Sequence, residues 1–400
     1  MFKCFGPAFE RIEIGDVVMA DTKIEFLYLN EEDMIHAGVL NAGRCVDVMG
    51  EVMSLLSTGD VLMGGKGHND HGIQLMFPKQ SNIADFPLED SRDRRFMAMP
   101  AYVGGRFHMA GEKWYGSNGR NTAKGLPRSI LMVTLNDVET GAPLAYMSGN
   151  LLSAMRTGAM PGLAAHYLAP ENAKVLTLLG AGVVNKTCLM AYMAKLEGIE
   201  VLKIKGSSKT SKTAQALADF AKKNYPQLKM ITICETLEEA VRDADIISEA
   251  VSVANKQWPV LQPEWIKPGC LIISSGTMDL DLAYIRDHVT KVVDNIHMYE
   301  EYIHVYQEYD ENGNRRSSGT PGMFFVNMIT DGEIEASEVQ SLGNIVRGAD
   351  PGRTGEEEVI LVSVGGMPIL DVAWGHDCYE NAVKNGIGTK LKLWDTPYLH

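Results

Sequence analysis

An apolar run followed by a Gly-x-Gly turn predicts a dinucleotide-binding site in the middle of the chain. Residues 175–179 have the pattern of a parallel strand buried on both faces, and a helix-period segment follows the turn. Glycines let the backbone approach a pyrophosphate, and the first N–H groups of the helix favour its charge. We assign the turn and the helix start to cofactor binding: Gly180, Ala181, Gly182, Val183 and Val184. Asn185 stands where a third glycine is usual, so a plain strand-to-helix turn is the alternative.

The end of the next expected strand indicates which dinucleotide is bound. Residues 200–205 form this strand, and Gly-Ser-Ser-Lys-Thr follows with no acidic residue. An NAD site usually places Asp or Glu here to accept the ribose 2′-OH, whereas hydroxyls and a cation suit a 2′-phosphate. Ser207, Ser208 and Lys209 therefore favour NADP(H), with NAD as the alternative cofactor. The same residues could also form only a solvated loop that caps a helix.

The composition excludes several other functions. A formal net charge of −14 over 400 residues repels nucleic acids and anionic lipid surfaces. No apolar run approaches the ~18 residues of a membrane helix, and the first residues lack the apolar stretch of a signal peptide. We therefore expect a cytoplasmic protein without nucleic-acid or membrane partners. The cysteines lack CxxC spacing, and His68 and His71 lack a firm third ligand, so we predict no metal site.

The expected cofactor-binding residues must be positioned by an α/β fold. Strands and helices alternate across residues 166–330, which predicts a Rossmann-like, doubly wound parallel sheet. Residues 1–165 have the pattern of a strand, two helices and then antiparallel strands around glycine turns. A small-residue helix at residues 150–167, interrupted by Pro161, is the expected junction between domains. Residues 331–400 are of mixed character, and we expect them to fold back onto the N-terminal half.

Several fragments in order resemble one known family. They are AMPAYVGG, GEKWYGSN, LNDVETGAPLAYMSGNLLSAMRTGA, LLGAGVVNK, ADPGRTGEEEVILV and GIGTKLKL. Together they resemble the ornithine cyclodeaminase and mu-crystallin family over about residues 95–400, and more closely its longer branch of amino-acid dehydrogenases. The resemblance implies a Rossmann domain, a second α+β domain for substrate binding and dimerisation built from both chain ends, and a homodimer.

The resemblance also assigns the residues that hold the substrate. In the family, a lysine after MPAY and an arginine before a threonine bind the substrate carboxylate and line the reaction centre. Here these residues are Lys113, which is also a catalytic candidate, and Arg156, with Thr157 at the cofactor. The residue types suit this role, because an arginine fork binds a carboxylate bidentately and a lysine supplies a point charge or a proton. The alternatives are a salt bridge between domains for Arg156 and a solvated side chain for Lys113.

An earlier arginine also joins in carboxylate binding in the family, but this chain has no clear counterpart. Lys66, His71 and Lys79 lie in the corresponding region, and His71 is our substrate-binding candidate. The segment from residue 64 to residue 100 has an irregular pattern with several prolines, for which turns and short strands are expected. This region could shape a different substrate pocket.

A second catalytic candidate follows a late strand of the expected parallel sheet. Cyclodeaminases use an aspartate there, in a longer loop than this chain has. Ser275 and Gly276 begin the loop and are assigned to the cofactor, and Asp279 and Asp281 are the first and second choices for a catalytic carboxylate. The alternative is that one of the two aspartates caps the helix that follows.

The sequence is compatible with three functions. The resemblance implies hydride transfer between a nicotinamide and the α-carbon of an amino acid through an imine, and conversion of ornithine to proline and ammonia is the leading reaction. The first alternative is an NADP-dependent amino-acid or secondary-amine dehydrogenase, or an imine reductase, with net oxidation or reduction. The second is a non-catalytic, NADP-dependent protein that binds a small ligand, as mu-crystallin does.

Overall fold

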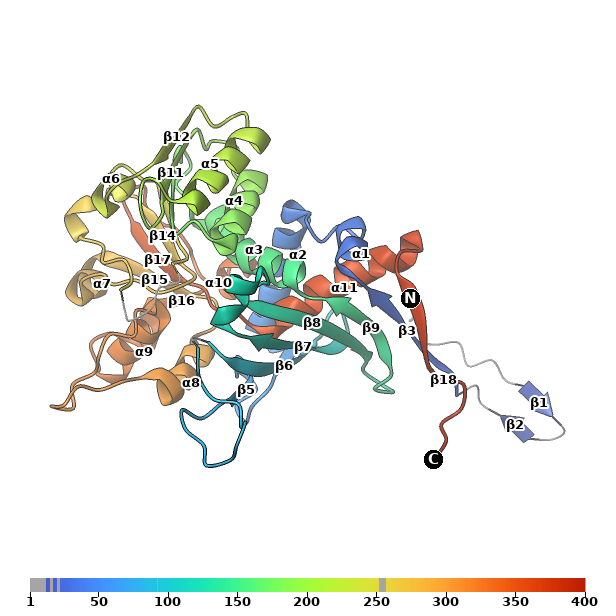
Figure 1. The fold of residues 1–400 in the computed structure, drawn as a ribbon. Helices are drawn as coiled ribbons and strands as arrows, with labels where there is room; N and C mark the ends of the chain where they lie inside the picture. The colour runs from blue at the N-terminus through green and yellow to red at the C-terminus, as the bar shows by residue number, and fades with distance from the viewer. Residues whose placement is uncertain (1–11, 15–16, 20–21, 92, 252–256, 400) are drawn as a thin grey trace.

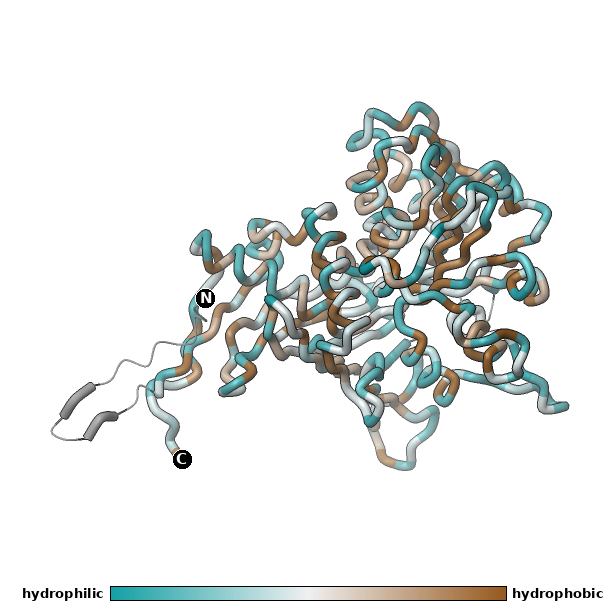
Figure 2. The backbone as a smooth tube through the Cα atoms, turned by 180° about the vertical axis from the view of Figure 1, so that it is seen from behind, coloured by the Kyte–Doolittle hydropathy of each residue, from teal (hydrophilic) through white to brown (hydrophobic). Residues whose placement is uncertain are grey.

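The fold is known from a computed structural model, which describes residues 12–14, 17–19, 22–91, 93–251 and 257–399. Two large sheets lie in two lobes, joined by helices between them (Figure 1). Hydrophobic residues run through the strands of the parallel lobe, and hydrophilic residues colour much of the surrounding helices and loops (Figure 2). In the part of the chain that the structure describes, no helix is long and apolar enough to cross a membrane.

The first lobe holds a parallel sheet of eight strands in the described residues, in the order β12-β11-β10-β13-β14-β17-β15-β16. The strands are β10 (Val175–Leu179), β11 (Val201–Lys205), β12 (Met230–Ile233), β13 (Ile246–Glu249), β14 (Leu271–Ser274), β15 (Val289–Val293), β16 (Val339–Ser341) and β17 (Val359–Ser363). The helices are α4 (Val183–Lys195), α5 (Lys212–Asn224), α6 (Leu237–Val241), α7 (Leu282–His288), α8 (Ile296–Tyr306), α9 (Pro321–Thr330) and α10 (Leu342–Arg347). The first five strands have the order of a dinucleotide-binding sheet, which confirms the predicted Rossmann-like fold.

The parallel sheet extends beyond the end that we expected at residue 330. Strands β16 and β17 belong to the same sheet, and β17 is inserted between β14 and β15. All five residues of β17 are buried, as in a central parallel strand. The order of strands in space is a long-range property, so the sequence pattern did not reveal that residues 359–363 return to this sheet.

The second lobe is built around a mixed sheet in the order β18-β3-β9-β8-β7-β6-β4, with β5 also paired to β6. Its strands are β3 (Ile24–Leu29), β4 (Val61–Met63), β5 (Ile73–Met76), β6 (Arg95–Val103), β7 (Met109–Ser117), β8 (Ser129–Asp137), β9 (Pro143–Ser148) and β18 (Thr389–Trp394). Its helices are α1 (Glu31–His36), α2 (Ala42–Thr58), α3 (Asn150–Leu168) and α11 (Pro368–Asn385), and an antiparallel pair of strands, β1 (Ile12–Ile14) and β2 (Val17–Met19), precedes them. Because β18 pairs with β3, both chain ends contribute to this lobe, as predicted.

Alternation along β6 and β7 determines which side chains face the core. On β6, Met97, Met99, Ala101 and Val103 are buried, while the residues between them are more exposed. On β7, Met109, Lys113 and Tyr115 are buried on the same alternating pattern. Helix α11 packs against β6 and β7, so Lys113 is placed between the sheet and this helix.

Helix α3 connects the two lobes and continues through Pro161, contrary to the interruption that we expected. The proline costs the helix one hydrogen bond, about 3 kcal/mol in a helix interior. Close packing on α4 opposes this cost: a Cβ on Gly158 would lie 2.5 Å from the backbone nitrogen of Cys188, and one on Gly162 would lie 2.6 Å from the Cβ of Ala191. The two helices therefore approach closely and hold α3 in one piece.

Candidate active site

Two buried cations share one buried carboxylate in the second lobe. The Nζ of Lys113 lies 2.8 Å from Oδ2 of Asp371, and the Nε of Arg156 lies 3.0 Å from Oδ1 of the same residue. The side chains of Lys113, Arg156 and Asp371 are only 3%, 5% and 0% exposed. Both cations also lie 3.3 Å from the Oγ of Ser153. Strand β7 and helices α3 and α11 thus converge on one point.

The electrostatics of this cluster leave a positive charge without a partner. Burial and the neighbouring charge of Arg156 lower the pKa of Lys113 to about 8, although Asp371 opposes the shift. Burial alone would raise the pKa of Asp371, but the charges of Arg156 and Lys113 outweigh it and hold this pKa below its usual range. An excess charge in a buried place is costly unless an anion binds to it. The cluster therefore suits a ligand with a carboxylate.

His71 is the third predicted substrate residue, and it lies beside this cluster. Its Nδ1 contacts the carbonyl oxygen of Gly366, and a Cβ on Gly366 would lie 3.0 Å from Cε1 of His71 and 3.1 Å from Nη1 of Arg156. Burial and the charge of Lys113 lower the pKa of His71 to about 3, so the ring is neutral at pH 7. Because a carbonyl accepts, Nδ1 carries the proton and Nε2 is left as an acceptor.

A cavity of about 370 Å³ extends from His71 along the parallel lobe. Its lining consists of His71, Gln74, Arg95, Trp258, Tyr302, Tyr306, Glu308, Ser317, Ser318, Thr320 and Met323. The ring centroids of His71 and Tyr302 lie 5.8 Å apart in an edge-to-face arrangement. Both lobes contribute to the walls, so a ligand here would lie between the mixed and the parallel sheet.

The turn after β10 fits a dinucleotide. Gly180 has a φ of +95°, and a Cβ there would lie 2.7 Å from the carbonyl oxygen of Ala250. Gly182 is the N-cap of α4, has open space where its Cβ would be, and provides no side chain to cap the helix. The first N–H groups of α4 are thus free to face a pyrophosphate. Val183, 64% exposed, begins the helix at this surface.

Asn185 explains why the third glycine is absent. Its buried Nδ2 donates to the carbonyl oxygens of Leu179 and Gly180, at 2.7 and 2.8 Å, and its Oδ1 accepts from the Oγ of Ser248 at 3.0 Å. The amide therefore ties the turn to β10 and β13. A glycine could make none of these side-chain contacts.

The other predicted cofactor residues occupy different environments. Ser275 Oγ is buried and has no hydrogen-bond partner among the described residues, as expected of a group that awaits a ligand. The N–H of Gly276 donates to Glu249, which also accepts from the Oγ of Ser274, and burial raises the pKa of Glu249 to about 7. Ser207, Ser208 and Lys209 are exposed after β11. Thr157 instead donates to the carbonyl oxygen of Ser153 within α3, at 2.7 Å.

The two aspartate candidates differ in their surroundings. Asp279 accepts hydrogen bonds from Trp258 Nε1 at 2.6 Å and from Ser317 Oγ at 2.5 Å. Both donors line the cavity, so Asp279 stands behind its wall. Asp281 caps α7, because its Oδ1 accepts from the N–H of Tyr284 at 2.7 Å. The capping alternative therefore describes Asp281, and we do not assign it a catalytic role.

The sequence reasoning missed Asp371 and Arg95. Asp371 lies in the first turn of α11, and the only signal for it is one acidic residue in an apolar helical segment. Arg95 begins β6 and lines the cavity, but the charged run that precedes it has the pattern of a solvated loop. The structure describes no group of three residues able to hold a metal ion.

Residues 41–386 match the model of the ornithine cyclodeaminase/mu-crystallin family. This chain belongs to that family. Among the curated relatives is N-((2S)-2-amino-2-carboxyethyl)-L-glutamate dehydrogenase of Staphylococcus aureus, 27% identical over 372 residues, which cover 92% of this chain and 99% of the relative. Delta(1)-pyrroline-2-carboxylate reductase of Bacillus cereus is 28% identical, over 69% of this chain and 76% of the relative. These names confirm the predicted class of enzyme, an NAD(P)-dependent dehydrogenase or reductase.

Solved structures agree with this assignment. An archaeal alanine dehydrogenase, described as a dimer with bound NAD, has a TM-score of 0.71 and 25% identity, and the match covers 93% of this chain and 100% of the other. Delta(1)-pyrroline-2-carboxylate reductase of Thermococcus litoralis, described with NADH and L-proline, also has a TM-score of 0.71 and 25% identity, over 91% and 99%. The predicted two-domain fold is therefore shared with enzymes that bind a nicotinamide cofactor.

Proposed function

We propose that this protein is an NAD(P)-dependent dehydrogenase that oxidises a substituted amino acid at its α-carbon, or in reverse reduces the corresponding imine. The observation that carries the proposal is the pair of buried cations, Lys113 and Arg156, which share the single carboxylate of Asp371 beside the cavity. The excess positive charge provides a place for the α-carboxylate of an amino acid. The relatives named above support this type of reaction.

The side chains of the site have two roles, substrate binding and proton transfer. Arg156 holds the α-carboxylate with its Nη groups, of which Nη2 makes only a long contact of 3.3 Å to Ser153, and Asp371 fixes the guanidinium through Nε. Lys113, with its pKa lowered to about 8, adds charge and can exchange a proton near pH 7–8. The free Nε2 of His71 accepts a hydrogen bond from the substrate nitrogen. A dinucleotide whose pyrophosphate is held at the turn after β10 would supply the nicotinamide that accepts or donates the hydride.

Net oxidation is favoured over the cyclodeaminase reaction that was our leading prediction. Both carboxylate oxygens of Asp279 are engaged by Trp258 and Ser317, which makes this carboxylate less available to a substrate amine. In addition, the relative whose length is matched almost completely is named a dehydrogenase of a secondary amine. We therefore propose that the hydride stays on the cofactor and that water hydrolyses the imine.

Reduced-nicotinamide absorbance tests this function. The protein is mixed with NADP+ or NAD+ and a panel of amino acids and N-substituted amino acids, including L-ornithine. A steady rise supports the proposal. A low plateau with accumulating ammonia identifies a cyclodeaminase. No change in absorbance with any compound favours the alternative of a non-catalytic protein that binds a small ligand.

The cofactor is proposed to be NADP(H). Support comes from the end of β11, where Ser207, Ser208 and Lys209 are exposed and no acidic residue is present to accept a ribose 2′-OH. The two structural relatives are described with NAD and NADH, so NAD(H) remains the alternative that a direct comparison of affinities must exclude.

We further propose a homodimer formed through the mixed sheet. Phe96, Trp114 and Ile130, on the neighbouring strands β6, β7 and β8, are 39%, 36% and 47% exposed. The rings of Phe96 and Trp114 stack with centroids 5.7 Å apart. A contiguous apolar patch on a sheet face is typical of an interface. Light scattering would give twice the 43.9 kDa chain mass, and Ile130→Lys should shift the protein toward the monomer.

A further inference from the structure

We infer that Arg95 binds a second carboxylate of the substrate, carried on the part of the molecule beyond the α-carbon. The inference rests on the proposed function, because it requires the α-carboxylate to lie at Lys113 and Arg156. The substrate class is then an amino acid or imine with an acidic group at both ends. Arg95 lies in the segment from residue 64 to residue 100, where the family resemblance gave no clear carboxylate-binding arginine, and it is not among the substrate candidates Lys113, Arg156 and His71.

Arg95 and the buried cation cluster lie on different parts of Tyr115. Nη2 of Arg95 lies 3.5 Å from the hydroxyl oxygen of this tyrosine, whereas Nζ of Lys113 lies 5.8 Å from the centre of its ring. His71, which lies beside Arg156, and Arg95 both line the same cavity. One elongated ligand can therefore reach both cationic places.

The guanidinium of Arg95 is poorly satisfied by the protein. Its Nη1 lies 3.4 Å from Oε1 of Gln74, and its contact with Tyr115 is equally long, so both are at the outer limit of hydrogen bonding. Its buried Nε makes no hydrogen bond among the described residues, although Oδ1 of Asp93 lies 3.2 Å away. Asp93 is shared, because its Oδ2 lies 2.8 Å from Arg128. The planar fork of Arg95 thus has donors left for a carboxylate.

The rest of the cavity suits such a ligand. Next to Arg95 the cavity carries the polar side chain of Gln74, which contacts Tyr306, and elsewhere its lining includes Ser317, Ser318 and one carboxylate, that of Glu308. Trp258, Tyr302 and Met323 provide flat or apolar surface along the same cavity. A ligand with an apolar middle and two acidic ends would place each part against matching chemistry.

The test measures binding without turnover. Calorimetry on the enzyme saturated with NADP+ compares α,ω-dicarboxylates from succinate to pimelate with monocarboxylates of equal chain length. We expect at least one dicarboxylate to bind about tenfold or more tightly than its monocarboxylate. Arg95→Gln should abolish this preference and leave monocarboxylate affinity unchanged. Arg95→Lys, which keeps a charge but loses the fork, should retain part of the preference.

Arg94→Gln is the matched control, because Arg94 pairs with Asp90 and lies over the ring of Phe77 rather than in the cavity. This variant should keep the full preference. The inference is overturned if wild-type enzyme shows no preference for dicarboxylates, or if Arg95→Gln and Arg94→Gln behave alike. If the preference depends on Arg95 but no amino acid reduces the cofactor, the second anion site stands and the proposed reaction fails.

Discussion

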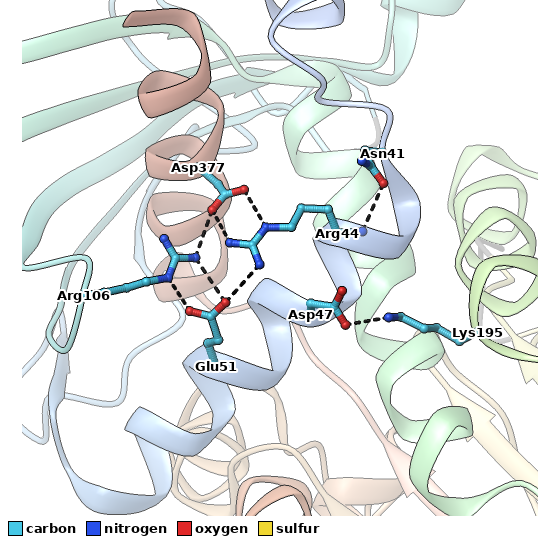
Figure 3. A network of polar contacts seen from close by, with 7 residues as sticks. All are labelled: Asn41, Arg44, Asp47, Glu51, Arg106, Lys195 and Asp377. Atoms are coloured by element: carbon cyan, nitrogen blue, oxygen red, sulfur yellow. Dashed lines mark hydrogen bonds and ion pairs between the residues drawn. The ribbon is translucent and has the colours of Figure 1, made fainter. Parts of the chain in front are cut away.

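Helix α11 carries two ion networks, one at Asp371 and one at Asp377, and they differ in burial and in charge balance. The network at Asp371 is closed to solvent and contains two cations for one carboxylate. The second network contains Arg44, Glu51, Arg106 and Asp377 (Figure 3). It has two cations for two carboxylates, and its arginines are 40% and 39% exposed.

The two networks therefore have different physical roles. The balanced, half-exposed one ties α2 and the turn between β6 and β7 to α11, and such pairs contribute little to stability. The unbalanced, buried one cannot be justified by stability, because burying an extra charge is costly. A bound carboxylate would balance the charge, as we propose for the substrate. Both networks consist of cationic and carboxylate side chains, so the difference between them is the number of cations per carboxylate and the burial. This difference distinguishes a candidate binding site from a structural contact.

We expect the largest difference in kcat/KM between two variants that each lose one arginine, one from each network. Arg156→Ala is expected to lower kcat/KM about 1000-fold, which corresponds to ~4 kcal/mol of lost transition-state stabilisation, since a buried carboxylate contact disappears. Arg106→Ala removes an arginine of similar chemistry from the balanced network and should change kcat/KM less than threefold. Steady-state kinetics checks both. Equal losses in the two variants would remove the distinction between the networks.

The two aspartates should differ in stability. Asp371→Asn leaves two buried cations without their carboxylate and is expected to lower the free energy of unfolding by about 3–5 kcal/mol. Asp377→Asn should cost about 1 kcal/mol, because solvent and Glu51 still reach its arginines. Urea unfolding in the presence and absence of a carboxylate ligand measures both. A larger loss at Asp377 would contradict the comparison.

The buried network should also respond to pH. Because the pKa of Lys113 is lowered to about 8, its ammonium is lost as pH rises through 8, and carboxylate ligands prefer the protonated form. The affinity for pentanoate is expected to fall up to about tenfold between pH 7 and pH 9. His71 does not change charge in this window, since its pKa is about 3. The Lys113→Gln variant should bind pentanoate weakly, and its affinity should not depend on pH in this range. If the variant and the wild type show the same pH dependence, a group other than Lys113 titrates.

The smallest effect is expected at the exposed end of the cofactor site. Lys209→Ala should weaken NADP(H) about five- to tenfold and leave NAD(H) nearly unchanged, because only the 2′-phosphate would meet this ammonium. Fluorescence titration with both reduced cofactors measures the difference. Lys212→Ala, a lysine at the start of α5, is the matched control. Equal weakening of both cofactors would contradict the NADP(H) proposal.

The sequence was informative where structure is local. The strand-turn-helix at Gly180 follows from periodicity and turn chemistry and agrees with the structure, and so does the helix of residues 150–168 except for the interruption expected at Pro161. The strand that carries Lys113 was expected from alternation, but the burial of Lys113 was not, because a solvated side chain was the alternative. The family motifs supplied Lys113 and Arg156, which the fold brings onto one carboxylate. The partners contributed from distant segments were not foreseeable. Asp371 is 258 residues from Lys113 in the chain, and no local pattern marks such a contact.

We propose that Lys113 and Arg156 hold an amino acid for hydride transfer with net oxidation. The most direct test uses the amino acid that gives the fastest absorbance rise, labelled with deuterium at the α-carbon, and follows the label by mass spectrometry. We expect a primary isotope effect, with the deuterium retained on the reduced nicotinamide and a 2-oxo acid as product. Deuterium returned to the α-carbon of the product, with ammonia released, would contradict it and identify a cyclodeaminase.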